Sequence, residues 1–398
     1  MAIAVVALVG ALLIAGSQAL LFVDTNDFKR VVGHLFLTPL GDGIRWALPD
    51  KPFRTASNPE LASHIFMLAA WVQRFLPGHV FDLARTALVA TCMLVVYAGV
   101  VAWQCTAALQ RGAGWFTGIA LAWLAVFFMA HTIGMAQSFY SEYAFLIAFP
   151  LLLVGLLASS PRARLVCLGV GALVCGLAKV QYFYLPLLVL VCLWVAAWWQ
   201  RGAVDKALVK LLLLIQVLCL VPMLTGKNAA LNAHHGLYLG AYMVLTPEQL
   251  DALGVSPTQR SCIGVDAWGN ALSGPGGTQV QPGAVSCYPE APRLGKGDVL
   301  RPYWHYPQAL LRLAQDALPS HFTVHYFHVY PAHRYLKRIE GDLQPVTDLL
   351  MRMTDERDRY ISPLAPWLLV GALVFFALSR SQRVIGLRGL ALAGLVLG

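Results

Sequence analysis

The sequence predicts an all-α polytopic membrane protein. Its 398 residues are 58% hydrophobic and only 12% charged, with a mean hydropathy of +0.64, and this composition is too apolar for a water-soluble globular chain. A bilayer core of about 30 Å is crossed by about 20 apolar residues at 1.5 Å per residue. About nine runs reach or approach that length: 2–23, 86–109, 116–130, 144–159, 165–178, 180–199, 207–226, 362–379 and 384–398.

The two ends of the chain are the least ordinary of these runs. Residues 2–23 carry no charge and end in the small-residue stretch of a signal peptide, but no basic region precedes them. We therefore expect an uncleaved first span. The last run stops at Gly398 without a polar tail, as expected of a piece of a longer protein.

Positive charge in the short loops predicts the topology, because cytoplasmic loops retain Lys and Arg. One set of alternate loops contains a single acid, Asp205, and many cations. These cations are Arg111, Arg162, Arg164, Arg201, Lys206, Lys210, Arg380, Arg383 and Arg388. This set should face the cytoplasm of a bacterial inner membrane, so that the long polar segments lie outside. The net charge of +9 then reflects topology, and binding to nucleic acid is not expected.

The chain divides into three predicted regions. Residues 1–226 form a transmembrane module with a structured outer segment at 24–85, residues 227–361 form an extracytoplasmic loop region, and residues 362–398 form a terminal transmembrane hairpin. In the first outer segment, residues 59–76 have the apolar spacing of an amphipathic helix, with Leu61, Ile65, Leu68, Val72 and Phe75 on one face and Glu60, His64, Gln73 and Arg74 on the polar face. Such a helix can lie in the membrane interface or cap the bundle.

Two cysteines stand apart from the six in apolar runs. Cys262 and Cys287 flank a stretch rich in Gly, Ser and Pro in the second outer region. In an oxidising compartment they would plausibly form a disulfide worth about 3 kcal/mol, and the alternative is two unpaired thiols.

Acidic and basic residues arrive together at the end of the first run. If that helix continues past Val23, the spacing of three places Asp24 and Asp27 on one face. One aspartate could then act as general base while Lys29 or Arg30 neutralises a phosphate. The equally weighted alternative is structural, with Asp24 as an N-cap and Asp27 in the first turn of the next helix.

Two further charges lie beside apolar runs. Glu142 follows Ser138 in a short outer loop, where a functional carboxylate and a simple interfacial anchor are equally good interpretations. Lys179 and Gln181 interrupt a long apolar stretch, which predicts a tight outer turn near membrane depth. The Lys179 ammonium could hold a phosphate or pyrophosphate there, or it could extend to the surface as many interfacial lysines do.

The polar residues that follow residue 226 could bind sugar hydroxyls or phosphate. They are Asn228, Asn232, His234, His235 and Tyr238. The histidines at 321, 325, 328 and 333 have helical spacing but no accompanying acids or thiols, so no metal site and no cofactor are predicted. Nucleotide-binding and common hydrolase motifs are absent from the sequence, which argues against most nucleotide-driven pumps and hydrolases.

The arrangement of an acid after the first span, a structured first outer loop and a large late outer loop resembles the GT-C superfamily of membrane glycosyltransferases. Residues 138–143, 178–181 and 228–240 also resemble segments of poorly characterised bacterial membrane proteins of glycan assembly. The resemblance implies a GT-C-like bundle, a polyprenyl-linked sugar donor, and Asp24 or Asp27 as catalytic base. A metal-dependent reaction is not implied, because no acidic metal motif follows in a later loop.

The resulting hypothesis is inverting, metal-independent transfer of a sugar from a polyprenyl-phosphate or polyprenyl-pyrophosphate donor to a glycan, lipid or protein acceptor. The leading alternative is a lipid-linked glycan flippase or a polymerase accessory protein, and a third is a structural scaffold. A catalyst requires the charges at positions 24, 27, 142 and 179 to converge, whereas a scaffold has no such requirement.

Overall fold

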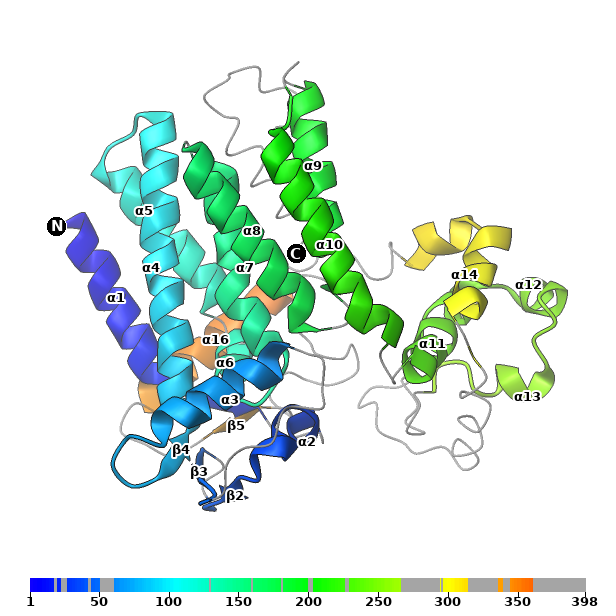
Figure 1. Cartoon of the computed structure of the whole chain (residues 1–398), viewed down its shortest axis with the longest axis horizontal. Coiled ribbons are helices and arrows are strands. Elements are labelled where there is room, and N and C mark those ends of the chain that lie inside the picture. Colours follow the sequence, from blue (N-terminus) through cyan, green and yellow to red (C-terminus); the bar gives the residue numbers. More distant parts are fainter. Residues whose placement is uncertain are drawn as a thin grey trace. The chain divides into compact units, whose positions relative to one another are not determined.

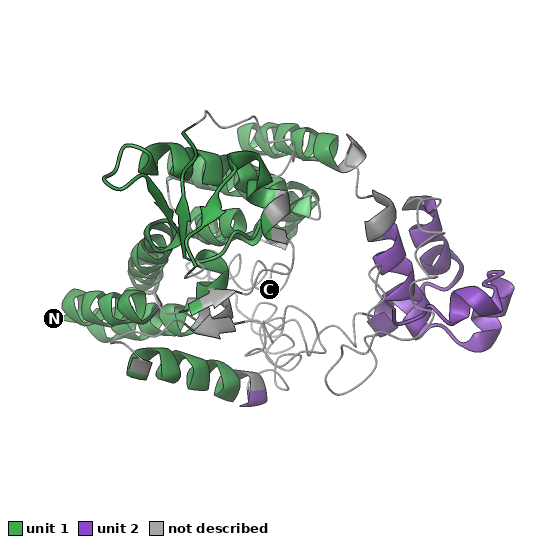
Figure 2. Ribbon diagram, turned by 90° about the horizontal axis from the view of Figure 1, so that it is seen from below, with its two compact units in different colours: residues 1–224, 335–357, 367–398 green, residues 225–334, 358–366 purple. Residues whose placement is uncertain are grey.

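The computed structural model describes residues 1–17, 20–22, 27–41, 44–50, 61–128, 130–158, 160–179, 182–199, 203–225, 229–265, 294, 296–313, 336–338 and 344–360. These residues are mostly helical and fall into two compact units (Figure 2). Unit 1 contains the described residues within 1–224 and 335–357, and unit 2 contains those within 225–334 and 358–366.

Unit 1 is a set of packed helices, shown in Figure 1. They are α1 (Ala2–Ser17), α4 (Leu83–Leu109), α5 (Ala113–Phe127), α6 (Ala130–Ala136), α7 (Glu142–Leu157), α8 (Pro161–Ala178), α9 (Leu185–Trp199), α10 (Lys206–Thr225) and α16 (Gln344–Tyr360). The largest interface joins α7 and α8, and α4 packs against α5, α7 and α1.

Local chemistry sets the ends of two of these helices. Asp82 caps α4, because its carboxylate accepts a hydrogen bond of 2.8 Å from the backbone N–H of Ala84. Ser160 caps α8 in the same way. Pro161 suits the first helical position, because it has no backbone N–H that would need an acceptor there. These caps fix where the long apolar helices begin.

The first outer segment folds as a small layer at one end of unit 1. It contains α2 (Asp27–Val32), η1 (Gly33–Leu35), β2 (Thr38–Pro39), β3 (Arg45–Ala47), α3 (Leu61–Gln73) and β4 (Val80–Asp82). The strands form an antiparallel sheet in the order β2-β3-β4, and β4 leads directly into α4. The helix predicted near residues 59–76 is present as α3, and the placement of this segment on the outer side of a membrane stays a prediction.

A second, two-stranded sheet joins distant parts of the chain. Strand β1 (Leu20–Phe22) pairs antiparallel with β5 (Leu336–Arg338), and the Thr347 hydroxyl donates to the carbonyl of Gly16 at 3.2 Å. The first helix therefore ends at Ser17, and the prediction of one continuous span over 2–23 is wrong. Residues 20–22 pair with β5 instead of continuing the helix.

Two helices in the described part of the chain are long and apolar enough to cross a membrane, Leu83–Ala107 within α4 and Pro161–Ala178. Shorter apolar helices of 10–17 residues, below the length of about 20 that a perpendicular crossing requires, lie at Ala2–Gly16, Leu61–Gln73, Ala113–Ala125, Glu142–Leu157 and Leu185–Val195. The structure supports a helical protein but not nine spans. The runs predicted at 362–379 and 384–398 lie outside the described residues.

Unit 2 consists of short helices held by local caps. They are α11 (Ala229–Tyr238), η3 (Ala241–Val244), α12 (Pro247–Ala252), α13 (Pro257–Arg260) and α14 (Lys296–His305). Thr246 with Gln249, and Ser256 with Gln259, form reciprocal capping boxes that start α12 and α13.

Glycines allow α7 and α8 to approach closely. A Cβ atom added to Gly171 would lie 2.8 Å from Leu152 Cδ2 and 3.1 Å from the Leu152 backbone nitrogen, and one added to Gly155 would lie 2.8 Å from Leu168 Cγ. Leu152 and Leu168 are fully buried in the core that α7 and α8 share with α9 and α10. The hairpin therefore depends on the absence of side chains at these two positions.

We expect Gly171→Ala to destabilise the protein by about 1–3 kcal/mol, because the added methyl group overpacks this interface. The matched control is Gly118→Ala on α5, where nothing lies within 4 Å of the added atom and the change should be neutral or slightly stabilising. Thermal unfolding of the detergent-solubilised protein measures both. Equal effects of the two variants would contradict the close-packing account.

Candidate functional site

A buried ion pair connects the ends of α7 and α8. The Lys179 Nζ donates to Glu142 Oε1 at 2.6 Å, and the two side chains are only 13% and 11% exposed. The Ser141 hydroxyl donates to the other carboxylate oxygen at 3.2 Å. Two predicted site residues, 37 positions apart in sequence, are thus brought into direct contact.

Helix geometry favours this pair. Glu142 is the first residue of α7, and Lys179 follows the last residue of α8, where the backbone becomes extended. A carboxylate is stabilised at a helix N-terminus and an ammonium at a C-terminus. The antiparallel hairpin therefore places each charge at the helix end that stabilises it.

The charge state of Glu142 results from opposing effects. Burial acts to raise its pKa, whereas the Lys179 ammonium and the hydrogen bonds from Lys179 and Ser141 lower it, and the net pKa lies below the ordinary value. Glu142 is consequently a carboxylate at neutral pH. A carboxylate with a depressed pKa is a good partner for a cation and a weak base while the pair is intact.

The segment that leads to Glu142 is almost completely buried. Residues 132–144 have buried side chains throughout, including the polar residues Gln137, Ser138 and Ser141. Phe139 is at the centre of an aromatic cluster formed with Phe28 of α2, Trp46 of β3, Phe66 of α3 and Phe81 of β4, with ring centroids 5.3–5.5 Å from that of Phe139. Four of the six elements of the outer layer therefore contribute one ring each to the cluster.

This cluster brings the segment around Asp27 close to the ion pair. Phe28, between Asp27 and Lys29, also packs edge-on against Tyr140 at 5.4 Å, and Tyr140 is two residues before Glu142. Asp27 is the first residue of α2, so it starts a new helix as the structural alternative expected. A face shared with Asp24 on one continuous helix is excluded, because α1 ends at Ser17.

Several predicted side chains cannot be placed. Asp24, Gln181, Asn228 and Cys287 lie outside the described residues, as do the histidines from 321 to 333. Asp27, Lys29, Arg30 and Asn232 belong to described helices, but their side chains are not among the described ones. Their predicted roles stay predictions. No group of three or more possible metal ligands occurs among the side chains that are described.

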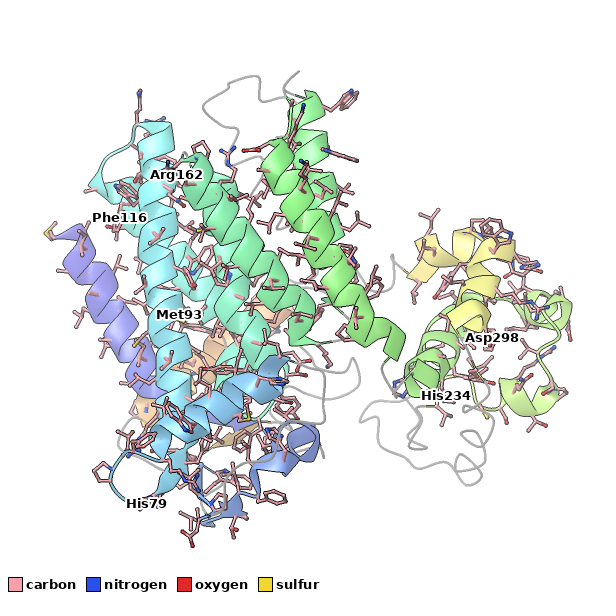
Figure 3. All side chains as sticks on the ribbon, viewed as in Figure 1. His79, Met93, Phe116, Arg162, His234 and Asp298 are labelled. Carbon is pink, nitrogen blue, oxygen red and sulfur yellow. The ribbon has the colours of Figure 1, made fainter. Side chains whose placement is uncertain are left out.

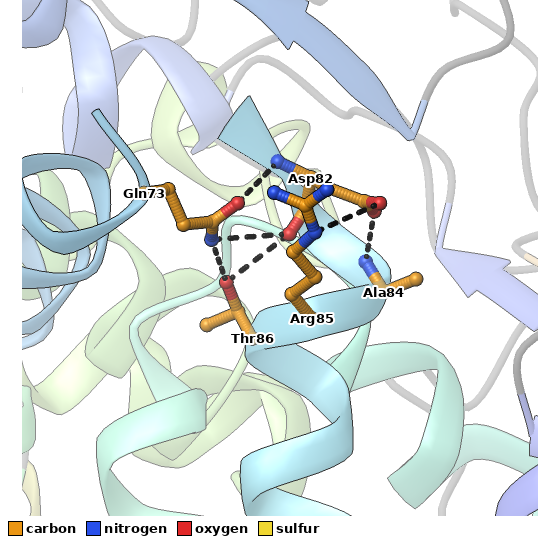
Figure 4. A network of polar contacts seen from close by, with 5 residues as sticks. All are labelled: Gln73, Asp82, Ala84, Arg85 and Thr86. Atoms are coloured by element: carbon orange, nitrogen blue, oxygen red, sulfur yellow. Dashed lines mark hydrogen bonds and ion pairs between the residues drawn. The ribbon is translucent and has the colours of Figure 1, made fainter. Parts of the chain in front are cut away.

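A polar network that the sequence analysis did not single out holds α3 against α4 (Figure 4). The Gln73 amide accepts a hydrogen bond from the Asp82 N–H at 2.7 Å and donates to the Asp82 carbonyl and the Thr86 hydroxyl, both at 3.2 Å. The Tyr143 hydroxyl donates to the Thr86 carbonyl at 2.8 Å. The network thus reaches from α3 through α4 to the residue after Glu142. The one sequence signal for it is Asp82, an N-cap residue just before an apolar run.

Two of the predicted residues in unit 2, His234 and Tyr238, contact each other. His234 is buried and stacks on Tyr238 at 4.6 Å, and its Nε2 lies 3.2 Å from the Val265 carbonyl. The Tyr238 carbonyl accepts from the N–H of Gly264 at 2.9 Å. Figure 3 labels His234 near the start of this unit. His234 and Tyr238 therefore hold the turn at 262–265 in place, whereas His235 is partly exposed.

Cys262 lies in this turn and is disulfide-bonded, in contrast to the six described cysteines of the apolar runs, which are free thiols. Because Cys287 is outside the described residues, its identity as the partner stays a prediction.

The fold and site define a mostly helical protein that has, among its described residues, two helices of membrane-crossing length and a buried ion pair beside an aromatic cluster. The chain is similar to the uncharacterized protein YfdI of Escherichia coli (strain K12), with 24% identity over 257 residues. The match covers 62% of this chain and 53% of YfdI, so the chain spans about half the length of that protein. Comparisons with known families and with solved structures find no match. These comparisons assign no family, so the GT-C resemblance stays a prediction.

We expect Glu142→Gln to lower the free energy of unfolding by about 3 kcal/mol, because it leaves the Lys179 ammonium buried beside a neutral group. Replacing both partners, as Glu142→Gln with Lys179→Met, should restore much of this loss. The control is Asp251→Asn, which breaks the ion pair of Asp251 with Arg260; Asp251 is 69% exposed, so a loss below about 1 kcal/mol is expected. A Glu142→Gln effect as small as the control would contradict the role of the buried pair.

The same pair predicts a direction of pH dependence. Because the pKa of Glu142 is lower in the folded state than its ordinary value, its stabilising contribution is complete at neutral pH. The contribution should be lost only as the pH falls below the ordinary carboxyl range and through the folded-state pKa. Unfolding of the wild type and of Glu142→Gln, compared along an acid series, should converge at the acid end, and a gap that widens there would contradict the assignment.

Proposed function

We propose that the chain is a membrane glycosyltransferase that moves a sugar from a polyprenyl-phosphate or polyprenyl-pyrophosphate donor to a glycan, lipid or protein acceptor. The observation that carries the proposal is the contact between the α2 segment, residues 138–143 and Lys179 in unit 1, since these segments hold the charges that a catalyst must bring together. The class of reaction comes from the resemblance to GT-C enzymes.

In this proposal Lys179 receives the donor phosphate. An ammonium has three N–H donors, so it can donate hydrogen bonds to a carboxylate oxygen and to a phosphate oxygen at the same time. Glu142 orients Lys179, and a bound phosphate competes with Glu142 for the cation. As the phosphate draws the ammonium away, burial would make Glu142 a stronger base than it is in the intact pair.

Asp24 or Asp27 is the proposed general base, with Glu142 as a further candidate. The base takes the proton of an acceptor hydroxyl, the oxygen attacks the anomeric carbon, and the bond to the phosphate oxygen breaks with its electron pair on the phosphate. Cations from Lys179, Lys29 or Arg30 would stabilise the leaving group, so no metal ion is required. Attack opposite the leaving phosphate inverts the anomeric configuration.

A groove on α4 supports a lipid-borne donor. Its lining is apolar and consists of Leu88, Val89, Cys92, Met93, Val96 and Tyr97. It begins two residues after Thr86, which accepts the hydrogen bond from Tyr143. Figure 3 labels Met93 midway along α4. An isoprenoid tail in this groove would keep its phosphate near the polar end of unit 1.

The proposed orientation follows from charge. Arg162 and Arg164 lie in the first turn of α8 and Lys179 lies at its other end, about 25 Å away at 1.5 Å per residue. With the arginines on the cytoplasmic side, Lys179 faces the periplasm or cell exterior of a multi-pass bacterial inner-membrane protein. The alternative of a flippase fits less well, because transporters place their substrate sites near the midplane and this ion pair lies at helix ends.

Binding of polyprenyl phosphate tests the phosphate site without knowledge of the sugar. The charge-neutral double variant, Glu142→Gln with Lys179→Met, should bind it at least about tenfold more weakly than wild type, equivalent to about 1.4 kcal/mol. Binding of the phosphate-free polyprenol serves as the matched control and should not change. Equal loss for both lipids would indicate general damage, and no loss for either would remove Lys179 from the phosphate site.

Transfer from a panel of polyprenyl-phosphate hexoses, read as release of polyprenyl phosphate, tests the base. Asp24→Asn or Asp27→Asn should reduce the rate by about 10²–10⁴-fold, the usual contribution of a general base. Asp205→Asn is the control, because Asp205 lies just before α10 and bonds only locally to the N–H of Ala207 among the contacts described. Full activity in both Asp24 and Asp27 variants would reject the proposed base.

A further inference from the structure

Helix α3 packs one face against the described protein and exposes large apolar residues on another. Its buried face consists of Ala62, Ser63, Phe66, Ala70 and Gln73, and Phe66 contacts the rings of Phe139 and Tyr143. Of the predicted stripe, Leu61 and Ile65 are half-buried, whereas Leu68, Val72 and Phe75 are exposed, together with Trp71. Leu68, Trp71, Val72 and Phe75 are 60%, 53%, 50% and 72% exposed.

The exposed stripe consists of apolar side chains. The 13 residues of α3 include no Asp, Glu, Lys or Arg, and Phe75 follows in the next turn, after Arg74, which donates to the Pro49 carbonyl. Trp71 and Phe75 pack edge-on at 5.1 Å, so they present one joined aromatic surface. Four large apolar side chains at helical spacing, with half or more of their surface uncovered, are an interaction surface rather than scattered exposure.

The position of α3 indicates what covers this stripe. The bonds from Gln73 to Asp82 and Thr86 hold the C-terminal end of α3 at the start of α4, the longer of the two described helices that could cross a membrane. Helix α3 also contacts α7 and α8, and Figure 1 shows it lying across the lower ends of α4, α7 and α8. It is therefore at the depth where α4 would enter the bilayer.

Exposed apolar side chains also occur near the start of α4. Leu88 and Val89, in the second turn of α4, are 45% and 57% exposed. A bilayer that surrounds α4 would reach α3, which is held at the start of α4, and aromatic residues such as Trp71 are favoured at the membrane boundary. We propose that α3 lies in the membrane plane with Leu68, Trp71, Val72 and Phe75 inserted among the lipids of the outer leaflet.

The proposal concerns lipid contact and does not depend on glycosyl transfer. It is tested with the full chain reconstituted in phosphatidylethanolamine and phosphatidylglycerol vesicles, with the photoreactive residue p-benzoylphenylalanine placed singly at position 71 or 75. Lipid adducts are measured by mass spectrometry. Leu40, 49% exposed in the β2–β3 turn, provides the matched outer-layer control, and Leu88 on α4 provides the membrane control.

Positions 71 and 75 should give about tenfold more lipid adduct than position 40, because only an inserted face touches acyl chains. Lipid adducts at 88 with none at 71 and 75 would overturn the proposal. Cross-links from 71 or 75 to a second copy of the chain would also overturn it, by assigning the face to a dimer contact. Absence of adducts at all positions, including 88, would show that α4 is not in lipid. The proposal would then be rejected, because it requires α4 to cross the bilayer.

Discussion

The contact between Glu142 and Lys179 constrains most of unit 1. Removing both charges from water costs several kcal/mol, so the pair is tolerable only with close geometry and additional hydrogen bonds. The hairpin supplies that geometry, because α7 and α8 must end at the same level for the carboxylate and ammonium to meet at 2.6 Å. The close approach at Gly155 and Gly171 fixes the register that allows this. The packing of α7 against α8 therefore positions Glu142 and Lys179 as well as stabilising the fold.

The sequence identified both members of this pair but not the pair itself. Each residue was conspicuous as a charge beside an apolar run, and the break in the apolar stretch at Lys179 is confirmed by the end of α8 at Ala178. The two residues are 37 positions apart in sequence, and their contact depends on how α7 and α8 align, which helical periodicity does not determine. The aromatic cluster at Phe139 could not be predicted from the sequence for the same reason, since the rings around Phe139 come from four separate elements.

Local patterns did not determine which neighbours the apolar residues have. The run at 2–23 was predicted to be one span, which is wrong, and for α3 the pattern predicted the helix but left its placement, in the membrane interface or over the bundle, open. Leu20 to Phe22 instead pair with a strand more than 300 residues away, which no local pattern predicts. In α3 the buried side is the one with small residues, because Ala62 and Ala70 let the helix approach closely while the larger residues remain outside.

Because α1 ends at Ser17, the proposed bases Asp24 and Asp27 are not positioned by one continuous helix. On a continuous helix, Asp24 and Asp27 would have shared a face fixed by the helix alone. Asp27 is instead the first residue of α2, and Asp24 lies outside the described residues. The elements before and after them in sequence are anchored, since β1 pairs with β5 and Phe28 packs against Phe139. Catalytic residues are common where a rigid scaffold positions the chain. Since α3 contributes Phe66 to the same aromatic cluster and exposes Trp71 on its opposite side, one rigid helix connects the surface proposed to contact lipid with the neighbourhood of Glu142. A lipid-borne phosphate at the depth of α3 would therefore approach the Lys179 ammonium from the membrane boundary, where reduced solvent screening strengthens its attraction to the cation.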